Sequence, residues 1–70
     1  MIPLAMAPEG EKQKIKKISG NDRVRRHLQE LGLVMDATVT VVSSENGNVI
    51  VGVGATRVAI GADLALRVMV

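Results

Sequence analysis

The sequence contains no cysteine and no aromatic residue, and each absence excludes a class of site. Without cysteine, the 70-residue chain has neither a disulfide framework nor a thiolate metal site. Without Phe, Trp or Tyr, it lacks the faces on which single-stranded nucleic acids stack and against which proline-rich peptides usually pack. The core of the protein must therefore be built from aliphatic side chains and methionine.

Long apolar runs are also missing. No stretch approaches the roughly 18 apolar residues that a membrane-spanning helix needs. The apolar N-terminus, MIPLAMAPEG, has no basic leader and is interrupted by Pro3 and Pro8, so it does not resemble a secretory signal. Since the chain begins with Met1, we expect a free-standing cytoplasmic protein that is peripheral to a membrane at most.

Excess charge of one sign is small. Nine basic and seven acidic residues give a formal net charge of +2, which is far from the signature of a nucleic-acid-binding protein. Part of the basic charge lies at Arg23, Arg25 and Arg26, and we predict that these arginines steer an acidic partner surface. The alternative is a solvated surface, whose ion pairs would each contribute about 0–1 kcal/mol to stability.

Helical periodicity is present in one segment, Asn21–Leu33. Its apolar residues recur at i, i+4 and i+7, which predicts a single stripe that faces the core. The stripe consists of Val24, Leu28 and Leu31. Ser19 or Asn21 is the expected N-cap, because a side-chain oxygen there can accept from a free backbone N–H of the first turn.

The end of this helix carries a second signal. Gly32 stands where a left-handed residue ends a helix, and a Schellman motif at this position would bring Leu28 against Leu33. A single helix on an open barrel can leave an apolar edge exposed, and exposed aliphatic patches mark partner sites. We therefore name Leu28 and Leu33, beside the arginines, as candidate partner-binding residues.

The rest of the chain predicts short strands. In Glu11–Ile18, Ile15 and Ile18 fall on opposite faces, which predicts a bulge or twist near Lys16–Lys17, and the lysines suit an edge strand. Later strands follow a period of two, joined by Asn46-Gly47, a type I′ hairpin signal. The later elements are expected at Thr38–Val41, Val49–Val53, Thr56–Ile60, a helical turn Gly61–Leu64 and a last strand Leu66–Val70.

These elements predict one mainly β domain over residues 1–70, a small, partly open barrel of about five strands with one α-helix. Residues 1–9 are expected to form an extended lead-in, because each proline biases the preceding residue toward extended backbone. Gly32, Asn46, Gly47 and Gly61 are the expected structural residues of the turns and caps.

The segments RRHLQELGL and RVAIGADLALRVMV resemble the ferrous iron transport protein A family, and the resemblance extends from about Gly10 to Val70. It implies an SH3-like barrel, of a type also found at the C-terminus of iron-dependent repressors. It also implies a non-enzymatic accessory protein of ferrous iron uptake, whose partner is the cytosolic GTPase portion of the membrane ferrous iron transporter B. One departure is Met35-Asp36, where the family usually has Pro-Gly. Asp36 is expected to adopt the positive φ of that glycine.

Direct metal chemistry has little support in the residues themselves. His27 is the only histidine, whereas zinc and iron sites need several converging donors. No metal site, cofactor or catalytic residue is therefore expected. Two other functions stay open at this point: a small basic barrel that binds nucleic acid, and a sensory or peptide-binding domain like that of the iron-dependent repressors.

Overall fold

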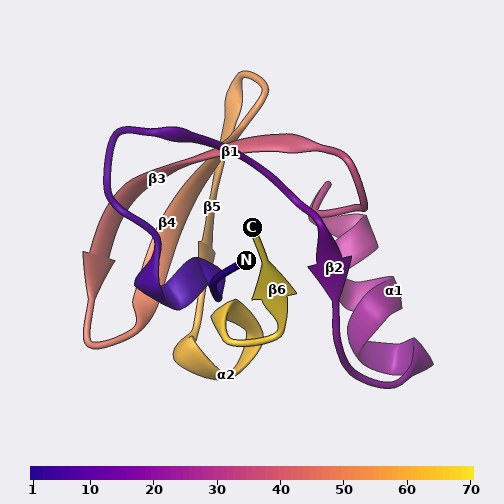
Figure 1. Cartoon of the computed structure of the whole chain (residues 1–70). Helices are drawn as coiled ribbons and strands as arrows, with labels where there is room; N and C mark the ends of the chain where they lie inside the picture. Colours follow the sequence, from indigo (N-terminus) through magenta and orange to yellow (C-terminus); the bar gives the residue numbers. More distant parts are fainter.

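Two antiparallel sheets, one nine-residue helix and two short helical segments surround a single aliphatic core (Figure 1). The computed structural model describes all of residues 1–70. In chain order the elements are the 3-10 turn η1 (Leu4–Met6), strands β1 (Lys12–Lys14) and β2 (Lys17–Ile18), helix α1 (Asp22–Glu30), strands β3 (Thr38–Glu45), β4 (Asn48–Val53) and β5 (Thr56–Ile60), helix α2 (Ala62–Ala65) and strand β6 (Val68–Met69). The larger sheet has the order β1-β3-β4-β5, and β2 pairs with β6 in the smaller sheet. The predicted mainly β, partly open architecture is confirmed.

The irregularity predicted in Glu11–Ile18 divides this segment between the two sheets. β1 pairs with β3, whereas β2 pairs with β6. Between them, the Ile15 N–H donates to the Ala37 carbonyl at 2.9 Å, and the next N–H, of Lys16, donates to the Met69 carbonyl at 2.8 Å. The change of partner buries Ile15 completely and Ile18 partly. The sixth strand arises because one expected strand becomes two.

Helix α1 begins and ends as its sequence predicts. The Asn21 side chain accepts from the Val24 N–H at 3.0 Å, and Leu28 is fully buried between two half-buried neighbours of the stripe. At the other end Gly32 has a φ of +87°. The Leu33 N–H donates to the Leu28 carbonyl at 2.9 Å, and the Gly32 N–H donates to the Gln29 carbonyl at 3.0 Å. These two bonds define the predicted Schellman motif.

The turns also follow the sequence, with one exception. Asn46 and Gly47 both have positive φ, 53° and 84°, as a type I′ hairpin requires, and Asp36 has a φ of 68°. Gly61 differs, because its φ of −73° is open to any residue. At this N-cap of α2 the cap bond comes from another strand, since Asn48 Oδ1 accepts from the Ala62 N–H at 2.9 Å.

The expectation of an extended lead-in is wrong for Leu4–Met6, which form the turn η1. The turn directs Leu4 into the core with no exposed surface, and Ala7 is 5% exposed. Ile2 and Val70 exchange backbone hydrogen bonds of 2.9 and 2.8 Å, so the two ends of the chain lie side by side. Burial of apolar side chains at the open end of the barrel outweighs the local preference of the prolines for extended backbone.

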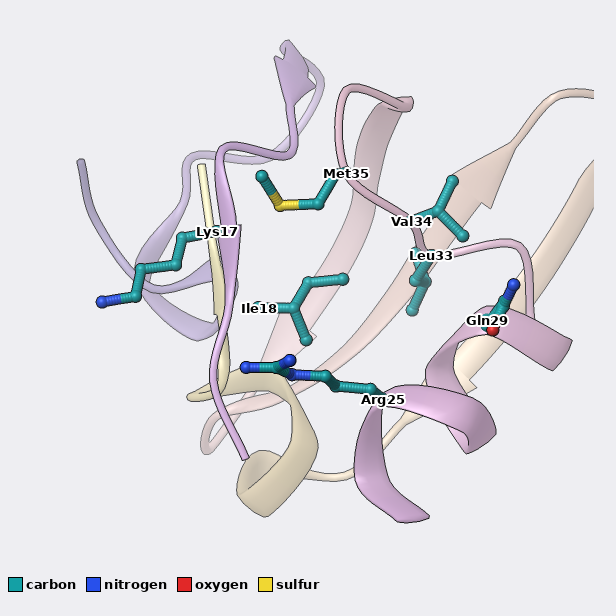
Figure 2. A pocket seen from close by; sticks show the side chains of 7 residues that line it. All are labelled: Lys17, Ile18, Arg25, Gln29, Leu33, Val34 and Met35. Atoms are coloured by element: carbon teal, nitrogen blue, oxygen red, sulfur yellow. The ribbon is translucent and has the colours of Figure 1, made fainter. Parts of the chain in front are cut away.

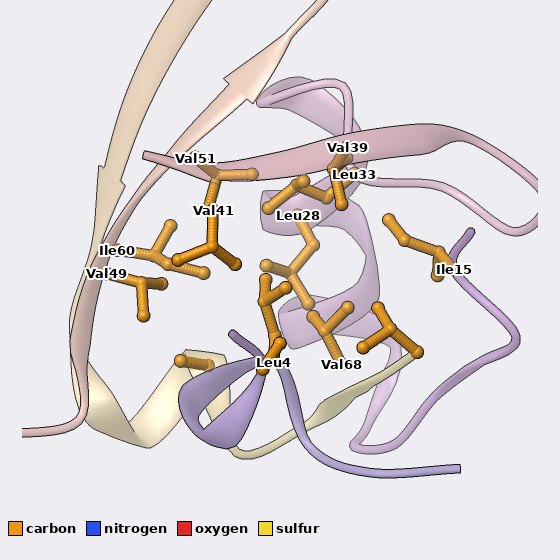
Figure 3. Close-up of a cluster of buried hydrophobic side chains, with 13 residues drawn as sticks. Leu4, Ile15, Leu28, Leu33, Val39, Val41, Val49, Val51, Ile60 and Val68 are labelled. Atoms are coloured by element: carbon orange, nitrogen blue, oxygen red, sulfur yellow. The ribbon is translucent and has the colours of Figure 1, made fainter. Parts of the chain in front are cut away.

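The core is aliphatic throughout (Figure 3). No polar or charged residue is buried. In Figure 3, Leu28 and Leu33 lie beside Val39 of the larger sheet, and Leu4 lies beside Val68 of the smaller one. Helix α1 and the N-terminal segment therefore pack against one common core. Its members are Leu4, Ala7, Ile15, Leu28, Leu33, Val39, Val41, Val49, Val51, Ile60, Ala65, Val68 and Val70.

Candidate functional site

A hollow of about 580 Å³ lies between β2 and α1 (Figure 2). Its apolar part is open to solvent, since Met35 is 54% and Val34 39% exposed. Ile18 of β2 is half-buried and Leu33 closes the base. The complete lining is Lys17, Ile18, Arg25, Gln29, Leu33, Val34 and Met35.

The chain reversal after α1 creates this exposed apolar patch. Once Gly32 has ended the helix, Leu33 enters the core and the next two residues are left outside it. A turn then follows, in which the Ala37 N–H donates to the Val34 carbonyl at 3.1 Å. The Asp36 N–H donates to the Ile15 carbonyl at 2.8 Å, which ties the turn to the segment before β2. One of these hydrogen bonds lies within the turn and the other joins the turn to the segment before β2, and together they fix the position of the patch.

The three arginines of α1 do not form one surface. Arg25 lines the hollow together with Gln29, and Figure 2 shows its side chain reaching from α1 toward Ile18. Arg23 and Arg26 lie on the outer side of the helix, with His27 and Glu30. The division follows from about 3.6 residues per turn, which groups residues three and four apart and separates neighbours by 100°. The three predicted partner-binding arginines therefore lie at two different hollows, and their contact with a partner stays a prediction.

The structure also corrects the two leucines. Leu28 and Leu33 have no exposed surface, so neither contacts a partner while the domain keeps this fold. Both belong to the core and to the helix-ending contact, as their spacing from Gly32 predicts. The apolar side chains that line the hollow are instead Ile18, Val34 and Met35, none of which was predicted to bind a partner. The available signal was an apolar pair directly after the helix-ending Gly-Leu.

The hollow has basic surroundings. Lys17 and Arg25 line it, and no carboxylate does. Asp36, which follows Met35 in the sequence, lies 3.7 Å from the Lys14 ammonium. Both side chains of this pair are mostly exposed, so the pair contributes about 0–1 kcal/mol. The hollow therefore combines an apolar patch with the positive charge of Arg25, whereas the Lys17 side chain leaves β2 on the opposite side (Figure 2).

No three His, Asp or Glu side chains lie close enough to hold a metal ion together. Neither helix has the length and apolar character needed to cross a lipid bilayer.

Comparison with known proteins identifies the family. The FeoA domain model matches residues 2–70. The chain belongs to the FeoA domain family. It is 36% identical over 70 residues to the "Putative Fe(2+) transport protein A" of Methanocaldococcus jannaschii, covering all of this chain and 85% of that relative.

Solved structures agree with the family and with the fold. A crystal structure of an iron uptake regulatory protein, FeoA, is 37% identical and covers 96% of this chain and 91% of that chain, with a TM-score of 0.90. FeoA of Stenotrophomonas maltophilia, complexed with zinc and described as an SH3 domain protein, is 29% identical, with 99% and 88% coverage and a TM-score of 0.80. The predicted SH3-like fold is thus confirmed.

A domain of the same shape occurs in a metal-dependent repressor. A manganese-dependent transcriptional repressor is 19% identical, with a TM-score of 0.85, and the match covers 94% of this chain but only 38% of the repressor. Likeness at this level of identity concerns the fold alone.

Proposed function

We propose that this FeoA domain is an accessory protein of ferrous iron uptake that binds the cytosolic GTPase portion of the membrane ferrous iron transporter B. The observation that carries the proposal is the family match over residues 2–70. It is supported by the relative named as a Fe(2+) transport protein and by the structure named as an iron uptake regulatory protein. In this role the domain acts in the cytoplasm and catalyses no reaction of its own.

The hollow between β2 and α1 is the surface that best fits such a role. Open apolar side chains in a shallow groove, with charge at the border, are typical of protein–protein contacts. Arg25 stands at this surface, whereas Arg23 and Arg26 lie on the other side of α1. Of the three predicted arginine contacts, we retain Arg25 at the docking surface and assign Arg23 and Arg26 to steering of the encounter.

The proposal is tested with two measurements. Purified protein is titrated with the separately expressed cytosolic portion of transporter B, and ferrous uptake is followed in a strain that lacks the gene, with and without the gene restored. We expect saturable binding, and uptake that falls in the deletion strain and recovers on complementation. Absence of binding together with unchanged uptake over a range of iron concentrations would contradict the proposal.

A nucleic-acid binding assay distinguishes this function from the alternative, a small basic barrel that binds nucleic acid. Retention on RNA or DNA that falls steeply with salt concentration would indicate counterion release, and hence nucleic-acid binding. We expect no retention at low salt, given the lack of aromatic residues and the small net charge.

A further inference from the structure

Strand β2 is an edge strand that borders the hollow. It pairs with β6 on one side only. β6, in contrast, has the N-terminal segment on its other side, through the bridge between Pro3 and Met69. In Figure 1, β2 lies between β6 and α1. Both residues of β2, Lys17 and Ile18, line the hollow. Edge strands carry a row of unpaired backbone N–H and C=O groups that a further strand can use.

The two faces of β2 differ in chemistry. Side chains alternate along a strand, and Figure 2 shows Ile18 and Lys17 leaving β2 in opposite directions. Ile18 points toward the patch formed with Val34 and Met35, whereas Lys17 points away from it. A strand added beside β2 would meet apolar contacts on one of its faces and positive charge on the other.

We propose that β2 and the adjoining hollow bind an extended peptide segment of alternating apolar and acidic residues, which adds as a strand to the free edge of β2. The apolar side chains of the segment lie over Ile18, Val34 and Met35, and its carboxylates face Lys17. Arg25 supplies a second cation at the border of the hollow. This inference rests on the proposed function, because it names the kind of transporter segment that docks.

The charges favour such a partner over a second copy of this chain. Pairing of two β2 edges would bring the lysines of both copies, Lys16 and Lys17, close together, and like charges on neighbouring strands are destabilising. The larger sheet ends in two further edge strands, β1 and β5. The hollow that lies beside both of them is mostly polar. Its lining includes Lys12, Thr38, Thr40, Thr56 and Arg57. A further hollow beside β5 includes Ile50, which is 40% exposed, but it is lined by Glu45 and by no basic residue. β2 is therefore the edge strand that combines an apolar patch with positive charge.

The first test uses the full 70-residue protein, labelled with ¹⁵N, and the peptide acetyl-Glu-Val-Glu-Leu-Glu-amide. We expect amide shifts at residues 17–19, 25 and 33–35, and slower hydrogen exchange at β2. Two control peptides separate the contributions. One has lysine in place of each glutamate, and the other has the same sequence with alternate backbone nitrogens methylated, which removes the N–H donors of an added strand.

Two protein variants carry the same lysine-to-glutamate change on different strands, one on β2 and one on β1. Lys17→Glu changes the charge on β2 and should weaken peptide binding about tenfold, since it replaces an attraction with a repulsion. Lys12→Glu makes the same change on the exposed edge strand β1 and should alter affinity by no more than about twofold. Equal melting curves of the two variants, followed by circular dichroism, establish that both are folded.

The inference is overturned if the peptide shifts no amide at millimolar concentration, or if the N-methylated peptide binds equally well. Equal losses in the two lysine variants would also overturn it. The cytosolic portion of transporter B serves as the second probe. If it binds and β2 amides exchange unchanged, the inference is wrong and the proposed function stands. If it does not bind and uptake is unchanged in the deletion strain while the peptide binds, the proposed function fails and the site on β2 stands.

Discussion

Replacement of Gly32 by alanine tests the turn that presents the hollow. Gly32 has a φ of +87°, and a Cβ atom there would lie 3.2 Å from Cγ1 of Val53. Alanine therefore meets two separate costs: a left-handed backbone that L-residues disfavour, and a contact tighter than ordinary van der Waals distance. Two other glycines allow these costs to be separated.

Gly10 and Gly47 form a matched series with Gly32. Both have a φ of +84°, almost the same as Gly32. A Cβ at Gly10 would have nothing within 4 Å, whereas one at Gly47 would lie 3.0 Å from the Cβ of Ala62. Val53 can adjust its rotamer, but Ala62 has no side-chain torsion and can yield only by movement of its backbone. The three substitutions thus share the φ penalty and differ in crowding.

The expected losses of unfolding free energy follow from this order. Gly10→Ala should cost about 1 kcal/mol, the net of left-handed strain and a more restricted unfolded chain. Gly32→Ala should cost about 2 kcal/mol, because a forced rotamer adds roughly 1 kcal/mol. Gly47→Ala should cost about 3 kcal/mol, in the range of overpacking that the structure cannot relieve by side-chain motion.

Urea unfolding followed by far-ultraviolet circular dichroism measures these values, since the chain has no aromatic residue for fluorescence. With a slope of about 1 kcal/mol per molar urea for a domain of this size, each kcal/mol shifts the midpoint by about 1 M. The double variant Gly32→Ala with Val53→Ala removes the crowding atom. Equal costs for all three single substitutions, or a double variant with no favourable coupling, would refute the reasoning.

Three further predictions concern stability. Leu28→Ala should lower the free energy of unfolding by about 2–5 kcal/mol, because Leu28 is fully buried. Since so small a core supplies only ~3–5 kcal/mol, the variant should show little cooperative unfolding. An unchanged melting temperature would contradict the assignment of Leu28 to the core. Asn21→Ala removes the acceptor of the Val24 N–H and should cost about 1 kcal/mol in urea unfolding, whereas a neutral result would mean that the cap adds nothing. Asp36→Gly relieves the backbone strain of a non-glycine residue with a φ of 68° and removes only an exposed ion pair with Lys14. The urea midpoint should therefore rise by about 0.5 M. A fall in the midpoint would show that the ion pair contributes more to stability than the backbone strain costs.

Local signals accounted for much of the fold. The helix, its cap at Asn21 and its end at Gly32 depend on contacts within a few residues, and so does the hairpin at Asn46-Gly47. Such contacts are encoded in short segments, which is why their positions could be predicted. The N-terminal segment could not, because the burial of Leu4 depends on a barrel end formed by residues distant in sequence.

The candidate site was predicted less well, for a physical reason. The apolar patch takes Ile18 from β2 and Val34 and Met35 from the turn after α1, and these meet only when the chain is folded. The arginines were recognised as a cluster in sequence, but helix rotation places Arg25 and Arg26 on different sides. Leu28 and Leu33 were predicted for both the core and a partner, and burial assigned them to the core alone.

The mainly β class, helix α1, the main turns and the family can be predicted from the amino-acid sequence, because period, turn residues and motifs are properties of short segments. The folded arrangement is needed to show which apolar residues stay exposed, which arginine faces the hollow, and which edge strand borders it. These depend on how elements far apart in the chain cover one another. β2 has a free edge because β6 pairs with it on one side and no strand of the chain pairs with it on the other.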